Sequence, residues 1–389
     1  MNRSRASLAL SIVIAAAAFI DAAGASGQTT PRRSQSLAED TFKNIQILRG
    51  IPVDEFMDTM GMFSAATGLN CAHCHVLDNG TGWEGYAVET PLKQTARRML
   101  RMMNALNKES FGGTRTITCN TCHRGDQKPK PVPSLAIQYS APVEDPNDVE
   151  SFPSSGMPTA DSIFDKYFAA LGGRARVDAL TSIASQGTYS GYDTEQTKVP
   201  VEIFTKTPAL KTTIVHTRFG DSVRTYDGAG GWIASADRPL PLMPLTGGNL
   251  SGARIDALLS FPATLKQAAP RWRVALTSLD DRDVYVLQGI PQARVGPDRA
   301  GPQAPINLYF DEETGLLVRA LRFADTAVGR VPTQIDFSDY RAVAGLKVPF
   351  AIKTTWTDGQ STIELADVRV NVAIDDARFK VPAPAVPFK

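Results

Sequence analysis

The sequence predicts a multidomain fold, in which an α-helical region is followed by a mainly antiparallel β-sheet domain. Three observations support this. Apolar residues recur with helical periodicity in the first third of the chain, a proline-rich stretch follows, and short alternating apolar and polar segments fill the remainder. A length of 389 residues suits two or three domains.

The first 27 residues have the features of a secretory signal peptide. Arg3 and Arg5 form a basic start, residues 8–20 are mostly apolar, and residues 23–25 are small enough for cleavage. The apolar run is too short to span a bilayer comfortably. We expect residues 1–27 to be removed and the mature chain to be periplasmic or otherwise exported, with no membrane span. An uncleaved anchor is the alternative.

Three helices are expected in residues 36–131. The first covers residues 36–50 and begins with a capping box. The second covers residues 52–68, with proline at its first position and glycine at its end. The third covers residues 91–107, with Thr90 as its N-cap.

Residues 132–158 are expected to form a proline-rich, extended linker. Few contacts should cross it, so we expect two separate folding units. The β-rich domain is predicted at residues 159–389 and begins with a helix at residues 160–171. Turn sequences such as Asp227-Gly228 then separate short strands. The expected strands are residues 201–204, 212–219, 284–287, 306–310, 316–323 and 362–370.

The four cysteines of the chain form two motifs of the type Cys-x-x-Cys-His. The motif residues are Cys71, Cys74 and His75, and Cys119, Cys122 and His123. This spacing is typical of haem c attachment, in which both thiols bond to the haem and the histidine binds the iron. We therefore predict two covalently bound haem c groups, with both motif histidines as axial ligands. A structural zinc site or a pair of disulfides is the alternative.

The second axial position of each iron decides between electron transfer and small-molecule binding. In residues 52–68, Met57 and Met60 share an apolar helix face, whereas Met62 points away from it. Met60 lies near the centre of that face, and we expect it to ligate the first iron. Packing in the core is the alternative for this methionine.

The helix at residues 91–107 carries Met99, Met102 and Met103 on an apolar stripe. We expect one of the three to ligate the second iron, and periodicity does not choose among them. His73 lies between two attachment cysteines and is expected to be exposed. His216, in a strand-like run, is expected to be structural.

The residues around the motifs resemble the photosynthetic reaction-centre cytochrome c subunit family over residues 41–131. The segments that carry the likeness are residues 42–52, 56–63, 68–75, 94–99 and 118–125. Full members of the family carry four haems, each attached after a helix that usually bears the axial methionine. The resemblance implies Met60 as a ligand of the first haem and Met102, or alternatively Met99, as a ligand of the second. This chain resembles only a two-haem half.

Short motifs in the β-rich region are similar to those of exported half-barrels that carry lipids or lipoproteins. They occur at residues 225–233, 308–318 and 337–350. The resemblance implies a half-barrel-like sheet that binds an apolar ligand. The region has one histidine and no cysteine, and its carboxylates are scattered, so no catalytic constellation is predicted there.

Together these observations predict a periplasmic dihaem c-type cytochrome that transfers electrons, with an appended β-rich domain that binds a ligand or partner. Redox proteins are the expected partners. The net charge of +1 does not indicate nucleic acid or an anionic membrane as a partner. One alternative is a haem peroxidase or oxidase with an open iron, and the other is an exported lipid or lipoprotein carrier with structural or sensory haems. A methionine on each iron favours the electron carrier over the catalyst.

Overall fold

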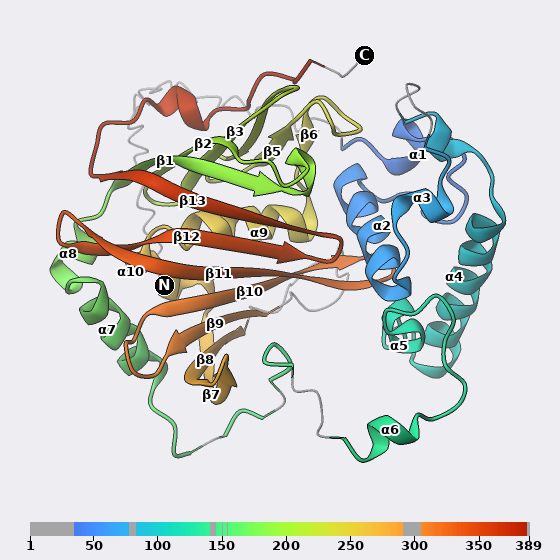
Figure 1. The fold of residues 1–389 in the computed structure, drawn as a ribbon, viewed down its shortest axis with the longest axis horizontal. Coiled ribbons are helices and arrows are strands. Elements are labelled where there is room, and N and C mark those ends of the chain that lie inside the picture. The colour runs from blue at the N-terminus through green and yellow to red at the C-terminus, as the bar shows by residue number, and fades with distance from the viewer. Residues whose placement is uncertain are drawn as a thin grey trace, which may run out of the picture. The chain divides into compact units, whose positions relative to one another are not determined.

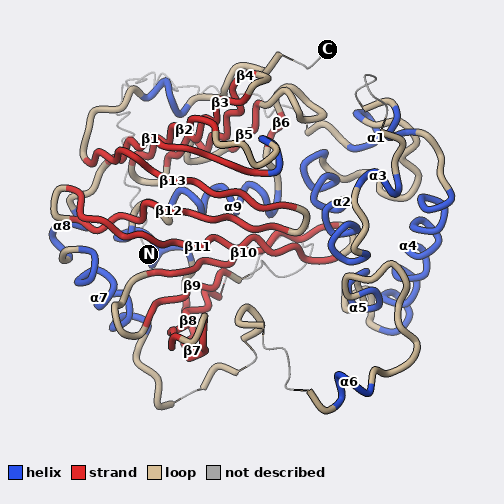
Figure 2. Tube along the Cα trace, viewed as in Figure 1, coloured by secondary structure: helices blue, strands red, loops and turns tan. Residues whose placement is uncertain are grey.

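The computed structural model describes residues 35–77, 83–140, 145–149, 151–153, 155–290 and 305–386. A helical region comes first in the chain, and one large antiparallel sheet with its covering helices follows (Figures 1 and 2). The predicted fold class is therefore confirmed. The predicted signal peptide lies outside the described residues.

The helical region contains two long helices and several short ones. Its elements are α1 Ala38–Thr41, α2 Val53–Thr67, α3 Cys71–Cys74, η1 Gly85–Ala87, α4 Pro91–Ser110, α5 Cys119–His123 and α6 Leu135–Gln138. The helices predicted at residues 52–68 and 91–107 are confirmed as α2 and α4. The Thr90 hydroxyl accepts a hydrogen bond from the Lys93 backbone N–H at 3.3 Å, as expected for an N-cap.

The helix predicted at residues 36–50 is wrong in its length, because α1 makes a single turn. Its capping box does not form. The Glu39 carboxylate instead accepts hydrogen bonds from the Gly50 backbone N–H at 2.9 and 3.0 Å. Asn44 then has a left-handed φ of 63°, which a continuous helix does not allow.

The sheet has 13 strands among the described residues, in the order β6-β5-β4-β3-β2-β1-β13-β12-β11-β10-β9-β8-β7. The strands are β1 Ser182–Gly191, β2 Val199–Lys206, β3 Leu210–Thr217, β4 Gly220–Tyr226, β5 Gly231–Ala234, β6 Met243–Pro244, β7 Arg271–Leu279, β8 Arg282–Ile290, β9 Ile306–Asp311, β10 Leu317–Thr326, β11 Gly329–Val343, β12 Leu346–Trp356 and β13 Gly359–Val370. Every pairing is antiparallel, and the first and last strands pair in the middle of the sheet. The sheet is open, because β6 and β7 are its edges.

Helices of the β-rich region cover one face of the sheet. They are α7 Ala160–Leu171, α8 Arg174–Asp178, α9 Gly247–Leu258 and α10 Pro262–Leu265. The 3-10 turns of this region are η2 Tyr192–Thr194, η3 Lys266–Ala268 and η4 Asp376–Phe379. The helix predicted at residues 160–171 is confirmed. It buries Phe164, whose ring packs edge-on against Phe310 of β9 with centroids 5.8 Å apart.

Helix α2 of the helical region packs against the sheet and α9 (Figure 1). Asp54 of α2 is buried and accepts hydrogen bonds from the backbone N–H and hydroxyl of Thr246 at 2.6 and 2.7 Å. Met62 joins Leu100 and Met103 in one apolar cluster with Ala324, Val328 and Val331 of the sheet region. The two regions therefore make more contacts than we expected from the linker sequence.

The proline-rich stretch itself also contacts the sheet. Val149 and Phe152 pack against a buried cluster of β7–β10, and the Arg273 guanidinium lies 4.4 Å from the Phe152 ring centroid. The Asn147 amide donates a hydrogen bond to Gln334 at 2.9 Å. The boundaries predicted at residues 36–131, 132–158 and 159–389 stay a prediction.

Candidate haem-binding site

The first cysteine motif follows directly from the end of α2. Gly68 ends that helix in a left-handed conformation, with φ of 68°, and α3 begins three residues later at Cys71. One helical turn separates Cys71 from Cys74, so both sulphur atoms lie on the same side of the backbone. Cys71 is exposed, Cys74 is half-buried, and neither forms a disulfide.

The ring of His75 is oriented by a backbone carbonyl. Its Nδ1 atom lies 3.1 Å from the Tyr86 carbonyl oxygen. A carbonyl only accepts hydrogen bonds, so Nδ1 carries the proton and Nε2 keeps its lone pair. Burial lowers the pKa of His75, which favours the neutral ring that binds a metal. Metal-binding histidines commonly have this second contact.

The second motif repeats this arrangement. A reciprocal pair of hydrogen bonds between Thr118 and Thr121 caps α5. The Nδ1 atom of His123 lies 3.0 Å from the Asp126 carbonyl oxygen, so Nε2 again keeps its lone pair. Cys119 is half-buried and Cys122 is exposed. Both motifs thus present two thiols and one oriented imidazole, which fits the donor set of haem c.

The two cysteine pairs do not gather into a zinc site. Among the described residues, which include all four cysteines, no group of three or more histidine, cysteine and acidic side chains could hold a metal ion. A four-cysteine zinc site requires its ligands to converge on one point.

Helix α2 places its three methionines in three different surroundings. Met60 is half-buried. Met62 is buried in the cluster shared with the sheet. Met57 lines a cavity under the sheet.

The exposed fractions of the three methionines on α4 distinguish among them, whereas helical periodicity did not. Met103 is 5% exposed and packs against the sheet-side cluster, whereas Met99 and Met102 are 39% and 47% exposed. Leu106 is exposed on the same stripe as these two. A large ring system such as haem could cover this exposed apolar stripe.

The remaining histidines occupy the positions expected of them. His73 is exposed, and its Nδ1 lies 2.7 Å from the Asn70 side-chain oxygen. His216 is structural, because it bridges Asp221 and Glu202 at 2.8 and 3.1 Å. On α4, the Arg97 guanidinium forms an ion pair with the Glu89 carboxylate at 2.6 Å.

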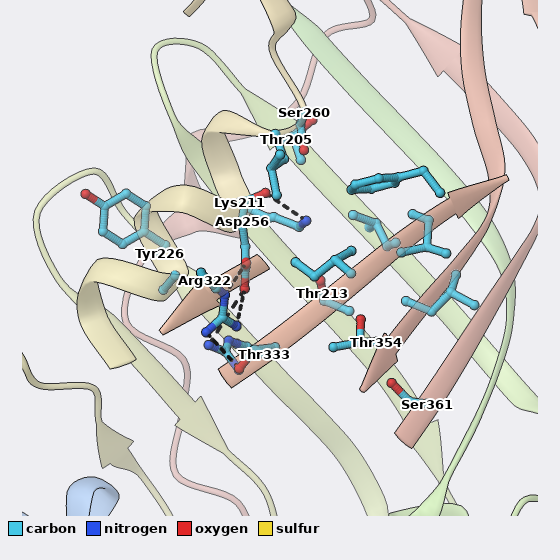
Figure 3. A pocket seen from close by; sticks show the side chains of 18 of the residues that line it. Thr205, Lys211, Thr213, Tyr226, Asp256, Ser260, Arg322, Thr333, Thr354 and Ser361 are labelled. Carbon is cyan, nitrogen blue, oxygen red and sulfur yellow. Dashed lines mark hydrogen bonds and ion pairs between the residues drawn. The ribbon is translucent and has the colours of Figure 1, made fainter. Parts of the chain in front are cut away.

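The position of the cavity under the sheet and the charged residues in its wall were not predicted from the sequence. A cavity of about 440 Å³ lies between the sheet, α9 and α2. One of its sides carries the charged residues Lys211, Asp256 and Arg322 (Figure 3). A sequence signal was present, since Arg322 takes an inward position of β10 between Ala320 and Ala324. Its acidic partner lies 66 residues away on α9, which no local pattern indicates.

Comparison with known proteins confirms the family resemblance. Residues 14–159 match the family model of the photosynthetic reaction centre cytochrome C subunit. The chain is 31% identical over 136 residues to the photosynthetic reaction center cytochrome c subunit of Thermochromatium tepidum, covering 34% of this chain and 30% of the relative. The corresponding subunit of Roseobacter denitrificans is 30% identical over 111 residues, covering 26% of this chain and 29% of the relative. The chain therefore spans about a third or less of these curated relatives.

Solved structures match the sheet region. They include a LolA superfamily protein from Nitrosomonas europaea, with a TM-score of 0.37 and 15% identity, covering 58% of this chain and 98% of that chain. A DUF1329 family protein from Desulfovibrio piger has a TM-score of 0.39 and 12% identity, with the same coverage of both chains. Among the described residues, no helix has the length and apolar character needed to cross a bilayer.

Proposed function

We propose, on the premise that residues 14–159 belong to the photosynthetic reaction-centre cytochrome c family, that this chain is an exported electron carrier with two covalent haem c groups. One observation carries the proposal. Each motif histidine donates Nδ1–H to a backbone carbonyl and leaves Nε2 free. Two such histidines, each beside a Cys-x-x-Cys pair, are what two separate haems require.

The first haem would be held by Cys71 and Cys74, with His75 and Met60 as axial ligands. When bound, a haem c group accepts and releases one electron. The protein residues fix its position and its surroundings. Tyr86 orients the imidazole through its backbone carbonyl and packs beside it, with ring centroids 4.9 Å apart.

The second haem would be held by Cys119 and Cys122, with His123 as one axial ligand and Met102, or alternatively Met99, as the other. Both methionines lie on the exposed stripe of α4. Met103 is a poorer candidate, because its side chain already packs in the cluster shared with the sheet.

Two methionine ligands favour electron transfer, since a thioether on the iron blocks the position that a peroxide or oxygen would take. Redox proteins would be the donor and acceptor. The β-rich region would serve as an appended domain that binds a ligand or partner. Export follows from the predicted signal peptide at residues 1–27.

Mass spectrometry of the denatured, purified protein tests the haem count. The intact protein should carry two haem additions. A variant with Cys119 and Cys122 both changed to serine should carry one, and so should the matched variant at Cys71 and Cys74. Two free thiols at either motif in the mature wild-type protein would refute the dihaem proposal.

Carbon monoxide distinguishes a carrier from an enzyme with an open iron. With both irons six-coordinate, the reduced protein should show the same visible spectrum with and without the gas. Rapid carbon monoxide binding to the wild-type protein would instead favour a peroxidase or oxidase.

A further inference from the structure

We propose that the cavity under the sheet binds a single-tailed amphiphile whose anionic head group is held by Arg224 and Lys211. This inference rests on the ligand-binding role proposed for the β-rich region and not on the haems. The volume of about 440 Å³ lies in the usual range of about 300–1,000 Å³ for small-molecule pockets.

Strand register brings the polar wall together. Thr205 pairs with Lys211 between β2 and β3, and Thr213 pairs with Arg224 between β3 and β4. Alternation along β3 then directs Lys211 and Thr213 to one face of the sheet, and both line the cavity.

Several donors in this wall have no acceptor. Among the described residues, the Arg224 side chain makes no hydrogen bond, and its closest charged partner is an Asp256 oxygen 3.9 Å away. The three-donor ammonium of Lys211 donates only to the Asp256 backbone carbonyl at 3.1 Å. Two buried atoms that belong to cavity-lining residues, Thr205 Oγ1 and Arg238 Nε, also have no hydrogen-bond partner within the described chain, and the nearest acidic oxygen to Arg238 Nε is one of Asp237 at 4.0 Å.

The carboxylates of Asp256, Asp54 and Asp58 already accept hydrogen bonds from other residues. Asp256 receives two hydrogen bonds from Arg322, at 2.8 and 3.0 Å. On α2, Asp54 is bound by Thr246, and Asp58 accepts from the Asn249 amide at 2.7 Å. Burial lowers the pKa of both Lys211 and Arg224, as expected for cations whose charge is incompletely balanced.

An anionic head group would supply the hydrogen-bond acceptors that the side chains of Arg224 and Lys211 lack. A buried unpaired donor costs stability, and a carboxylate or phosphate offers several acceptor lone pairs at once. An arginine guanidinium binds such groups in a bidentate geometry. The donors of Arg224 and Lys211 are therefore matched to an acceptor-rich anion.

The rest of the cavity suits an apolar tail. Val215, Ile335, Phe337 and Ile352 line it. Figure 3 shows Lys211, Asp256 and Arg322 gathered on one side, and the other side carries side chains without polar atoms together with the hydroxyls of Thr354 and Ser361. This separation of charge from hydrocarbon within one cavity favours an amphiphile over a small polar anion.

Calorimetric titration of the full mature holoprotein tests the proposal with three probes. Dodecanoate carries both head and tail, dodecanol lacks the charge, and acetate lacks the tail. Dodecanoate should bind with one site per chain and at least tenfold more tightly than dodecanol. Acetate should not bind measurably.

Arg224→Met should weaken dodecanoate binding by tenfold or more and leave dodecanol unchanged. Arg218→Met is the matched control, since Arg218 is an exposed arginine outside the cavity, and it should bind like the wild type. Lys211→Met provides the same test if Arg224→Met does not fold. Equal binding of dodecanoate and dodecanol, or no binding of either, would overturn the proposal. Haem content and spectra are measured separately, so a failure here leaves the electron-transfer proposal intact.

Discussion

At the residue scale, the proposed haem ligand Met60 and the buried packing residue Met62 should respond differently to substitution. Met60→Ala should open the first iron, permit carbon monoxide binding and lower its reduction potential, because the thioether is lost. Met62→Ala should leave the spectrum unchanged but lower the free energy of unfolding by about 2–4 kcal/mol, because Met62 is buried against the sheet. Visible spectra with and without carbon monoxide, a redox titration and denaturant unfolding give the three readouts. A Met60→Ala protein that keeps the wild-type spectrum and potential would exclude this ligand.

The pH dependence of stability can be assigned in part to His216. Its hydrogen bonds to the carboxylates of Asp221 and Glu202 raise the pKa of His216. The protonated form is therefore stabilised by folding, fully below the unfolded pKa of about 6.5, and this contribution is lost as pH rises through the folded pKa. The side chain is partly exposed, so we expect less than about 1 kcal/mol.

His216→Gln tests this assignment by denaturant unfolding at pH 6 and pH 9. The wild type should lose slightly more stability than the variant between these two values. High salt should reduce the difference, because it screens partly exposed charges. Identical pH profiles for the two proteins would show that His216 makes no contribution.

At the element scale, the end of α2 contacts the chain just after the second Cys-x-x-Cys-His motif and leads directly into the first. A Cβ atom added at Gly68 would lie 2.3 Å from the Gly125 carbonyl oxygen, just after the second motif. Gly125 in turn donates its backbone N–H to the Ala66 carbonyl at 2.9 Å. Gly68→Ala should therefore lower the free energy of unfolding by at least about 2 kcal/mol, from backbone strain plus a collision.

Gly112→Ala is the matched control for this substitution. Gly112 also has a positive φ, of 58°, but an added Cβ would meet no atom within 4 Å. It should cost only the backbone term of about 1–2 kcal/mol. Equal losses in the two variants, measured by denaturant unfolding, would mean that the contact between α2 and the second motif does not contribute.

At the scale of the whole molecule, the proline-rich segment and the packing of the helical region on the sheet lead to different expectations for limited proteolysis. The proline-rich segment should be cut first by proteases if its backbone is exposed. The two fragments should nevertheless stay together, because Met62, Leu100 and Met103 pack on the sheet and Asp54 is bonded to Thr246. Native size-exclusion chromatography after limited proteolysis should give one coloured peak, and denaturant should be needed to separate the fragments. A coloured fragment that elutes alone under native conditions would support independent domains.

Local features were predictable from the sequence. Residues 52–68, 91–107 and 160–171 gave helices because capping, proline and glycine signals act on neighbouring residues. The short helix at α1 was misjudged, because a contact between Glu39 and Gly50 replaced the local capping box. At the candidate site, the spacing indicated both attachment motifs, whereas the position of Met57 in the wall of a cavity was not predicted, because tertiary packing decides which face of α2 meets the sheet.

The sequence by itself determined the order of a helical region and a sheet region, and the two attachment motifs with their exposed or structural neighbours His73 and His216. These depend on residues a few positions apart. Only the tertiary structure decided that β1 pairs with β13, that α2 forms a wall of the sheet cavity, and that Arg224 and Arg322 approach the same aspartate of α9. These contacts join segments far apart in the chain, and their partners are selected by burial and strand register rather than by any local pattern.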